Sequence, residues 1–452
     1  MKIIIAGDGK VGSMLTSQLS GEGHDLTLID NNPEALESTI ERYDVMSVEG
    51  NCASMEVLRN AGVEEADLLI TATGEDELNL LCCMTAHGMN PKLHTIARIR
   101  KPDYAESTYA LQKLFALSLT VNPERQTARE IDRLLRYPGF LRREKFANGM
   151  VEIVELKVAA DSPLKDQALY DLSNITHCQV LVCAAVRDGK VVIPSGDFVM
   201  REGDRLFVTA SAKNLTILLQ SLGYVKQKIR SVMILGGGRN CYYLSQLLIK
   251  EGIDVKIIES DLERCEHLAE VLPSAVVVHG DVSHSAVLER ENIQNMDAVI
   301  SMTGIDELNV ITSLYADSLH VPKVITKLGR ADNLDLLSKM PVGSIVSPKE
   351  LCCNSIVTYV RAMKNQVGAA VTMHSIADGQ AEAIEFIVDS STRHLGQQLR
   401  EIHFKKNILL TSITRGRNII FPNGDSSFEI GDRVVIVSNG GTIQQLNDIF
   451  AG

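Results

Sequence analysis

A glycine-rich hexapeptide near the start of the chain has the residue types and spacing of a phosphate-binding loop. Gly7-Asp8-Gly9-Lys10-Val11-Gly12 matches G-x-G-x-x-G, and Asp30 closes the next apolar stretch. In such loops the first glycine permits a tight turn, the second admits a pyrophosphate, and the third lets helix and strand pack closely. The helix N-terminus then offers unpaired N–H groups to phosphate. Because the Asp30 carboxylate would accept ribose hydroxyls and repel a 2′-phosphate, the pattern favours NAD(H) over NADP(H).

The same constellation occurs a second time, 229 residues later by the difference between positions 236 and 7. Gly236-Gly237-Gly238-Arg239-Asn240-Cys241 keeps the first two key glycines, and Glu259 repeats the acid of Asp30. Cys241 stands where the third glycine is expected, and a thiol there should push the helix away from the strand. We therefore predict a second nucleotide site that binds more weakly or takes a different nucleotide. The competing interpretation of either loop is a glycine turn needed only for packing.

Further candidate ligand-binding residues follow the ends of predicted strands, where doubly wound sheets bind ligands. They fall into pairs with one member in each half of the chain: Asn51 and Asp281 for an adenine amino group, Thr73 (with Gly74) and Thr303 for ribose or phosphate, Arg98 and Lys327 as cations, and Lys10 and Arg239 within the glycine loops. For Thr73-Gly74 a simple helix-capping turn is an equal alternative, and for Arg98 a surface ion pair remains open.

Internal repeats explain the pairing and predict the architecture. Thr73-Gly74-Glu75-Asp76-Glu77-Leu78-Asn79 recurs as Thr303-Gly304-Ile305-Asp306-Glu307-Leu308-Asn309, and Gly203-Asp204-Arg205 recurs as Gly431-Asp432-Arg433. Offsets of 230 (303 minus 73) and 228 (431 minus 203) across the chain indicate a gene duplication.

Each half divides again into a larger and a smaller part. Short apolar segments such as Lys2–Ala6 and Leu68–Ala72 alternate with amphipathic ones, which predicts an α/β fold with two Rossmann-like, doubly wound parallel sheets. A helix follows each sheet, about Glu124–Leu135 and Lys349–Met363, and then a small α+β unit. The expected boundaries are residues 1–140, 141–228, 229–370 and 371–452.

Composition excludes several classes of protein. The 452 residues carry a formal charge of −12, which disfavours nucleic acid as a partner, and Arg142, Arg143 and Lys145 are expected to form a solvated cluster. No apolar stretch approaches the ~20 residues of a membrane span, and the N-terminal strand is too short for a signal peptide. The nine cysteines lack metal-binding spacing, so we expect reduced, buried thiols and no metal.

Catalytic chemistry finds little support. The acids of Glu75–Glu77 and Asp306–Glu307 begin helices, where carboxylates complement the helix dipole. No residue is identifiable as the acid or base of a hydride transfer, so we expect no enzyme activity. A nicotinamide-dependent oxidoreductase is the alternative function, and a redox-sensing transcription factor is a weaker third.

Two glycine-loop sheets, twin Thr-Gly-x-Asp-Glu-Leu-Asn segments and paired Gly-Asp-Arg strands resemble the TrkA family of potassium uptake proteins, whose modules are RCK N-type and C-type domains. The resemblance covers essentially the whole chain. By position it assigns Gly7, Asp8, Gly9, Lys10, Val11, Asp30, Thr73, Gly74 and Arg98 to a first nucleotide site, and residues 236–240, Glu259 and Thr303 to a second. Asn51 stands where an aspartate is usual, and Cys241 departs from the usual glycine.

The resemblance implies a regulatory, cytoplasmic subunit that lies on the inner face of the cell membrane against a membrane-embedded potassium transporter. It further implies binding of NAD(H) and adenine nucleotides such as ATP or ADP, and a homotetrameric ring. A nucleotide that prefers one of two conformations would then change the angle between the halves through the two long helices.

Overall fold

The computed structural model describes residues 1–104, 112, 114–136, 140–223, 229–329, 340–364, 370–377, 380–439, 443 and 445–451. The chain forms two compact units. The first comprises Met1–Arg129, Gly238–Leu244 and Ser347–Val360, and the second comprises Glu130–Gly237, Ser245–Val346 and Arg361–Gly452. No helix in the described part of the chain combines the length and apolar character that crossing a membrane requires.

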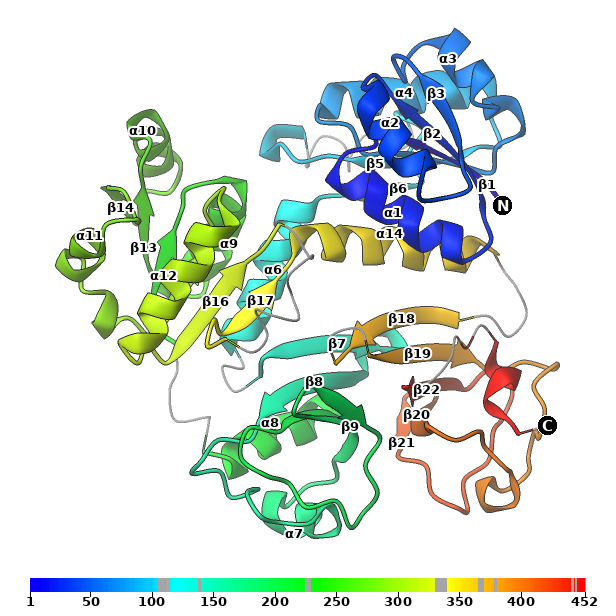
Figure 1. The fold of residues 1–452 in the computed structure, drawn as a ribbon, viewed down its shortest axis with the longest axis vertical. Coiled ribbons are helices and arrows are strands. Elements are labelled where there is room, and N and C mark those ends of the chain that lie inside the picture. Colours follow the sequence, from blue (N-terminus) through cyan, green and yellow to red (C-terminus); the bar gives the residue numbers. More distant parts are fainter. Residues whose placement is uncertain are drawn as a thin grey trace. The chain divides into compact units, whose positions relative to one another are not determined.

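A parallel sheet is the centre of the first unit (Figure 1). Its strand order is β3-β2-β1-β4-β5-β6, so the chain runs outward from β1, crosses back, and runs outward on the other side. The strands are β1 (Lys2–Ala6), β2 (Asp25–Asp30), β3 (Met46–Glu49), β4 (Leu68–Thr71), β5 (His94–Arg98) and β6 (Leu119–Val121). The connecting helices are α1 (Lys10–Gly21), α2 (Pro33–Ile40), α3 (Met55–Asn60) and α4 (Asp76–Met89).

Burial explains why these segments form central strands. Ile3, Ile4, Ile5 and Ala6 of β1 are at most 2% exposed, as expected for a strand covered on both faces. Reversal of the strand order beside β1 places the loops after β1 and β4 next to each other at the carboxyl edge of the sheet.

Two long helices follow the parallel sheets, α6 (Pro123–Arg136) and α14 (Pro348–Lys364). Within the first unit, the side-chain amide of Gln126 on α6 donates to the hydroxyl of Ser355 on α14 at 2.9 Å. These positions differ by 229, so equivalent points of the two duplicated helices touch each other.

A second parallel sheet lies in the second unit, with the order β14-β13-β12-β15-β16-β17. Its strands are β12 (Ser231–Leu235), β13 (Asp254–Glu259), β14 (Val276–His279), β15 (Ala298–Ser301), β16 (Lys323–Lys327) and β17 (Ser344–Val346). The helices of this half are α9 (Arg239–Lys250), whose first residues belong to the first unit, α10 (Leu262–Val271), α11 (Ser285–Arg290) and α12 (Asp306–Ser318).

Two antiparallel sheets complete the second unit. The orders are β10-β9-β11-β8-β7 and β18-β19-β22-β20-β21. Their strands are β7 (Arg142–Phe146), β8 (Val151–Lys157), β9 (Leu181–Arg187), β10 (Lys190–Val192), β11 (Arg205–Ser211), β18 (Ala370–Ile376), β19 (Ala381–Ile387), β20 (Ile408–Arg415), β21 (Asn418–Ile420) and β22 (Arg433–Ser438), with helices α7 (Leu172–Thr176) and α8 (Ala212–Ser221). Short 3-10 turns are η1 (Val63–Glu65), η2 (Ala147–Gly149), η3 (Leu169–Asp171), η5 (Ile293–Asn295), η6 (Leu399–Glu401) and η7 (Leu446–Ile449).

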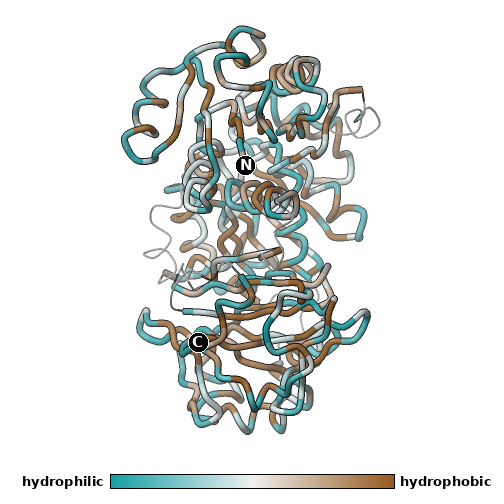
Figure 2. Tube along the Cα trace, turned by 90° about the vertical axis from the view of Figure 1, so that its right-hand side faces the viewer, coloured by the Kyte–Doolittle hydropathy of each residue, from teal (hydrophilic) through white to brown (hydrophobic). Residues whose placement is uncertain are grey.

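The two antiparallel sheets share one apolar core. Phe146, Ile153 and Phe207 of the first sheet cluster with Ile376 and Val437 of the second. In Figure 2 the strands of this region are largely hydrophobic and the loops that join them largely hydrophilic. The shared core joins parts of the chain that the duplication placed more than 200 residues apart.

The fold class is confirmed: two parallel Rossmann-like sheets are each followed by an antiparallel sheet. Eight of the nine cysteines are buried and none is in a disulfide, and Cys178 is partly exposed.

The expected solvated cluster around residue 142 was wrong for Arg143, whereas Lys145 is exposed and Arg142 is partly exposed. Arg142–Phe146 forms strand β7, and Arg143 is 8% exposed and ion-paired with the buried Glu152 of β8. Charge composition alone cannot distinguish a surface cluster from a strand whose arginine meets an acid from a neighbouring strand.

Candidate nucleotide-binding site

Each glycine of the first loop has a separate structural reason. Gly7 has a φ of +100°, and a Cβ there would lie 2.8 Å from the backbone nitrogen of Thr73. A Cβ on Gly12 would lie 1.9 Å from the carbonyl oxygen of Gly7, whereas one on Gly9 would meet no atom within 4 Å. Gly7 and Gly12 are therefore required by packing, and Gly9 leaves open space above the backbone.

No capping side chain bonds to the backbone N–H groups at the start of α1. Gly9 is the N-cap residue and makes no side-chain capping bond, and no acidic side chain lies in the first turn of the helix. Lys10 is exposed at this end, while Val11 is buried and its carbonyl faces the thiol of Cys353 on α14 at 3.7 Å. Free N–H groups, a positive dipole end and one cation together favour an anion here.

The acid at the end of β2 braces the loop. The Oδ2 atom of Asp30 accepts the backbone N–H of Asp8 at 2.6 Å, and its Oδ1 accepts that of Asn32 at 2.9 Å. A carboxylate has about four acceptor positions, so two remain for ribose hydroxyls. Glu259 repeats the arrangement in the other half, where its Oε2 accepts the N–H of Gly237 at 2.6 Å.

Thr73 follows β4 and is held by Asn79 of α4. The side-chain oxygen of Asn79 accepts both the backbone N–H of Thr73 at 3.0 Å and its hydroxyl at 2.7 Å. The amide of Asn79 donates to the carbonyl oxygen of Arg98 at 2.8 Å, which ties the loop after β4 to the end of β5. Gly74 is exposed in this loop.

The second half repeats this bracket atom for atom. Asn309 of α12 accepts the N–H of Thr303 at 2.7 Å and its hydroxyl at 2.8 Å, and donates to the carbonyl of Lys327 at 3.0 Å. Asn79 and Asn309 are fully buried. The sequence interpretation missed their role, although their repetition within the twin heptapeptides was the available signal.

The two strand-end cations point toward the same loops. The Nη2 of Arg98 donates to the carbonyl oxygen of Thr73 at 2.6 Å, and the Nζ of Lys327 donates to that of Thr303 at 2.6 Å. Burial lowers the pKa of Arg98 from its usual value. Arg98 therefore holds a loop carbonyl, and its predicted role as a cation of the nucleotide site stays a prediction.

Asn51 and Asp281 occupy exposed turns after β3 and β14. The side-chain oxygen of Asn51 accepts the N–H of Ala53 at 3.0 Å, and that of Asp281 accepts the N–H of Ser283 at 2.8 Å. Hydrogen bonds from Ser283 lower the pKa of Asp281. These local bonds do not test the contact with adenine, which stays a prediction.

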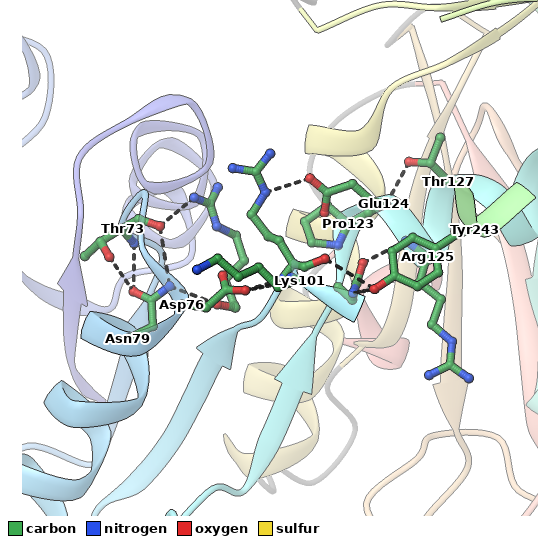
Figure 3. A network of polar contacts seen from close by, with 12 residues as sticks. Thr73, Asp76, Asn79, Lys101, Pro123, Glu124, Arg125, Thr127 and Tyr243 are labelled. Carbon is green, nitrogen blue, oxygen red and sulfur yellow. Dashed lines mark hydrogen bonds and ion pairs between the residues drawn. The ribbon is translucent and has the colours of Figure 1, made fainter. Parts of the chain in front are cut away.

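A polar network extends from the loop after β4 toward α6 (Figure 3). The Oδ2 of Asp76 accepts the backbone N–H groups of Arg100 and Lys101 at 2.8 and 2.7 Å, and the Nε of Arg100 donates to Glu124 of α6 at 2.6 Å. The hydroxyl of Tyr243, from α9, donates to the carbonyl of Arg100 at 3.3 Å. Asp76 was expected only to complement a helix dipole, and its contacts show that it also anchors the segment after β5.

The second glycine loop keeps the tight turn of the first, but most of its other residues differ. Gly236 has a φ of +103°, and a Cβ there would lie 2.9 Å from Cα of Thr303. Gly7 is confined in the same way by the backbone of Thr73. Gly238 precedes α9, which Arg239 and Asn240 begin, and Cys241 is fully buried within it. No group of three or more His, Cys, Asp or Glu side chains suited to a metal occurs among the residues that the structure describes.

A parallel sheet of this order, with a glycine loop after its central strand and an acid ending the next strand, defines a Rossmann-type nucleotide-binding fold. The TrkA-N domain model matches residues 3–117 and 232–348, and the TrkA-C domain model matches residues 153–222 and 383–451. The chain belongs to the TrkA family.

Named relatives agree with that assignment, and a solved structure shares the fold. The chain is 32% identical to the Trk system potassium uptake protein TrkA homolog 1 of Methanosarcina mazei over all of both chains. It is 32% identical to TrkA of Halomonas elongata over 96% of this chain and 95% of the relative. The fold is similar to that of a GsuK channel bound to NAD, with a TM-score of 0.61 and 18% identity over 97% of this chain and 76% of the other.

Proposed function

We propose that the protein is a nucleotide-binding regulatory subunit of a potassium uptake transporter and not an enzyme. The observation that carries the proposal is the duplicated brace, in which a strand-end carboxylate holds the glycine-loop N–H at 2.6 Å in both halves. That arrangement preorganises a loop for a nucleotide diphosphate, and the relatives are named as potassium uptake proteins.

NAD(H) is the proposed ligand of the first site, and ATP or ADP is a further ligand. The acid at Asp30 suits a free ribose, and solved GsuK chains of similar fold are described as bound to NAD and to ADP. Residues 7–11, Asp30, Asn51, Thr73, Gly74 and Arg98 form the proposed first site. Residues 236–240, Glu259, Asp281, Thr303 and Lys327 form the proposed second site.

Regulation is proposed to act through the long helices. A ligand seated on the loop after β4 would meet Thr73, and the Asp76–Arg100–Glu124 contacts join that region to the start of α6. The Gln126–Ser355 contact then joins α6 to α14. A nucleotide that binds one arrangement of the loop and the two helices better than another would shift the equilibrium toward that arrangement by its differential affinity.

The proposed assembly is a homotetrameric ring on the inner face of the cell membrane, against a membrane-embedded transporter. The apolar faces of α6 and α14 do not themselves argue for it: Ile131, Leu134, Ile356 and Val360 are at most 2% exposed within one chain. The support is the family and the repeated match to the TrkA-N and TrkA-C domain models, which would supply two modules per chain to a ring. The boundaries at residues 140, 228 and 370 are part of this proposal.

Affinity purification of the tagged full chain from membranes of its own organism tests the proposal. We expect a potassium transporter subunit in the eluate and NAD(H) or an adenine nucleotide by mass spectrometry. For the chain purified without its membrane partner, we expect a mass near four times 49.5 kDa by light scattering. A mass near 49.5 kDa would contradict the ring. Steady oxidation of NADH with simple carbonyl compounds would favour the oxidoreductase alternative.

A further inference from the structure

The two glycine loops differ at one buried pair of side chains. In the first half Asp8 follows Gly7, and its Oδ2 accepts the hydroxyl of Thr39 on α2 at 2.6 Å. In the second half Gly237 and Leu268 occupy the equivalent positions, because 237 minus 8 and 268 minus 39 both give 229. A polar, charged pair in one site thus corresponds to an apolar pair in the other.

Packing shows that the Asp8–Thr39 pair and the Gly237–Leu268 pair cannot be mixed. A Cβ added to Gly237 would lie 2.6 Å from Cδ1 of Leu268 and 3.0 Å from Oε2 of Glu259. Leu268 therefore fills the space that the Asp8 side chain and Thr39 share in the first half. The backbone N–H of residue 8 or 237 donates to the strand-end acid in both halves, so this contact of the loop is kept while the side-chain pair beside it changes.

The contacts of Asp8 within the chain use only one of its two carboxylate oxygens. Its residue is 6% exposed, its Oδ2 accepts from Thr39, and its Oδ1 is buried without a hydrogen-bond partner among the described residues. Its backbone nitrogen contacts Asp30, so two carboxyl groups lie together at the edge of the phosphate-binding loop. A buried acceptor with an unused oxygen next to an anion site acts on whichever anion binds there.

We propose that Asp8 with Thr39 determines ligand choice at the first site, disfavouring nucleoside triphosphates relative to dinucleotides, and that Gly237 with Leu268 removes this selection at the second. This inference rests on the proposed nucleotide-binding function. NADH carries about two phosphate charges and free ATP about four at neutral pH. Two further charges at ~8 Å in a water-like dielectric cost about fivefold in affinity.

The test is calorimetric titration of the full chain with NADH and with ATP, in a Glu259→Ala background that disables the second site. Asp8→Asn keeps the acceptor for Thr39 and removes the charge. We expect both nucleotides to bind more tightly, and the gain for ATP to exceed the gain for NADH by about fivefold, with this difference shrinking at ~0.5 M salt. Equal improvement for both ligands, or no change, would overturn the proposal.

Two further variants guard against a folding defect. Asp8→Gly with Thr39→Leu copies the pair that the second half already packs, and we expect the same shift toward ATP. Thr39→Val removes the hydroxyl and keeps the charge, so a gain for ATP in that variant would contradict the assignment to Asp8. If the Glu259→Ala chain binds neither nucleotide, the proposed first site itself fails, and this inference fails with it.

Discussion

The carboxylate of Asp30 and the backbone N–H of Asp8 are 2.6 Å apart, and the same distance separates Glu259 from the N–H of Gly237. The longer glutamate side chain reaches the same atom of the loop. Both contacts lie within the chain, so the carboxylate itself helps to shape the loop that the proposed nucleotide would meet.

Removing the charge of Asp30 should weaken nucleotide binding at the first site. Asp30→Asn keeps a hydrogen-bond acceptor and loses charge-assisted bonds to ribose, which are worth about 1.5–3 kcal/mol. Calorimetry with NADH measures the loss. Asp25→Asn, at the exposed opposite end of β2, is the matched control. An unchanged affinity in Asp30→Asn would refute a ribose role.

Gly12→Ala should abolish nucleotide binding at the first loop. The added Cβ would lie 1.9 Å from the carbonyl oxygen of Gly7, so α1 or the loop must move. Gly21→Ala, at the other end of α1 with no atom within 4 Å of the new Cβ, should be neutral or stabilise by up to about 1 kcal/mol. NADH titration combined with thermal unfolding separates the two effects. Wild-type affinity in Gly12→Ala would contradict the packing argument.

Arg98→Lys should be tolerated better than Arg98→Met. The second half already uses Lys327 to hold the carbonyl of Thr303, as Arg98 holds that of Thr73. We expect nucleotide affinity within about threefold of wild type for the lysine variant and a loss of at least about tenfold for the methionine variant, because a charged hydrogen bond contributes about 1.5–3 kcal/mol. Equal affinities of the two variants would show that the cation is dispensable.

Asp204→Asn should destabilise the first antiparallel sheet. The buried Asp204 carboxylate accepts two bonds from Arg187, at 2.8 and 2.6 Å, and one from the N–H of Arg201 at 2.7 Å. Breaking a largely buried pair leaves a charge uncompensated and costs about 3 kcal/mol. Asp188→Asn in the exposed turn after β9 is the control, since asparagine tolerates its φ of +52°. Equal unfolding temperatures of Asp204→Asn and Asp188→Asn would contradict a stabilising role for the Asp204–Arg187 pair.

The stability contribution of Asp8 should depend on pH. Burial raises the pKa of Asp8, Thr39 opposes that change, and the nearby Asp30 adds to it. A raised pKa means that the folded state prefers the neutral acid, so its stabilising effect is present at low pH and is lost as pH rises through the folded pKa. Asp8→Asn should therefore be more stable than wild type at neutral pH, with the gap closing toward pH 3.8. A gap that stays constant in denaturant titrations across this range would contradict the shift.

The parts of the site that could be predicted from the sequence are those with a local cause. Gly7, Gly12 and Asp30 lie within one strand–helix–strand unit, β1–α1–β2, so their spacing alone predicted their roles. The turn and packing roles of the two glycines are confirmed by the contacts that an added Cβ would make, and the ribose role of Asp30 stays a prediction. Asn79 escaped notice because its partners, Thr73 and Arg98, meet it only through the fold.

Strand β7 was missed for a different reason. Arg142, Arg143 and Lys145 resemble a solvated surface in composition, and only pairing with β8 supplies the buried partner Glu152. The Asp8–Thr39 pair was likewise invisible, since the difference from Gly237 and Leu268 matters only once helix and loop are known to touch.

The apolar core shared by the two antiparallel sheets bears on the origin of the chain. A single half would carry the same sheet face with Phe146, Phe207 or their counterparts open to water, and two such polypeptides would bury it against each other. Fusion of the two copies converts that encounter from a bimolecular step, which dilution reverses, into an intramolecular one set by the linker. Once the two copies were joined, their sequences no longer had to be identical, and the two glycine loops were free to diverge.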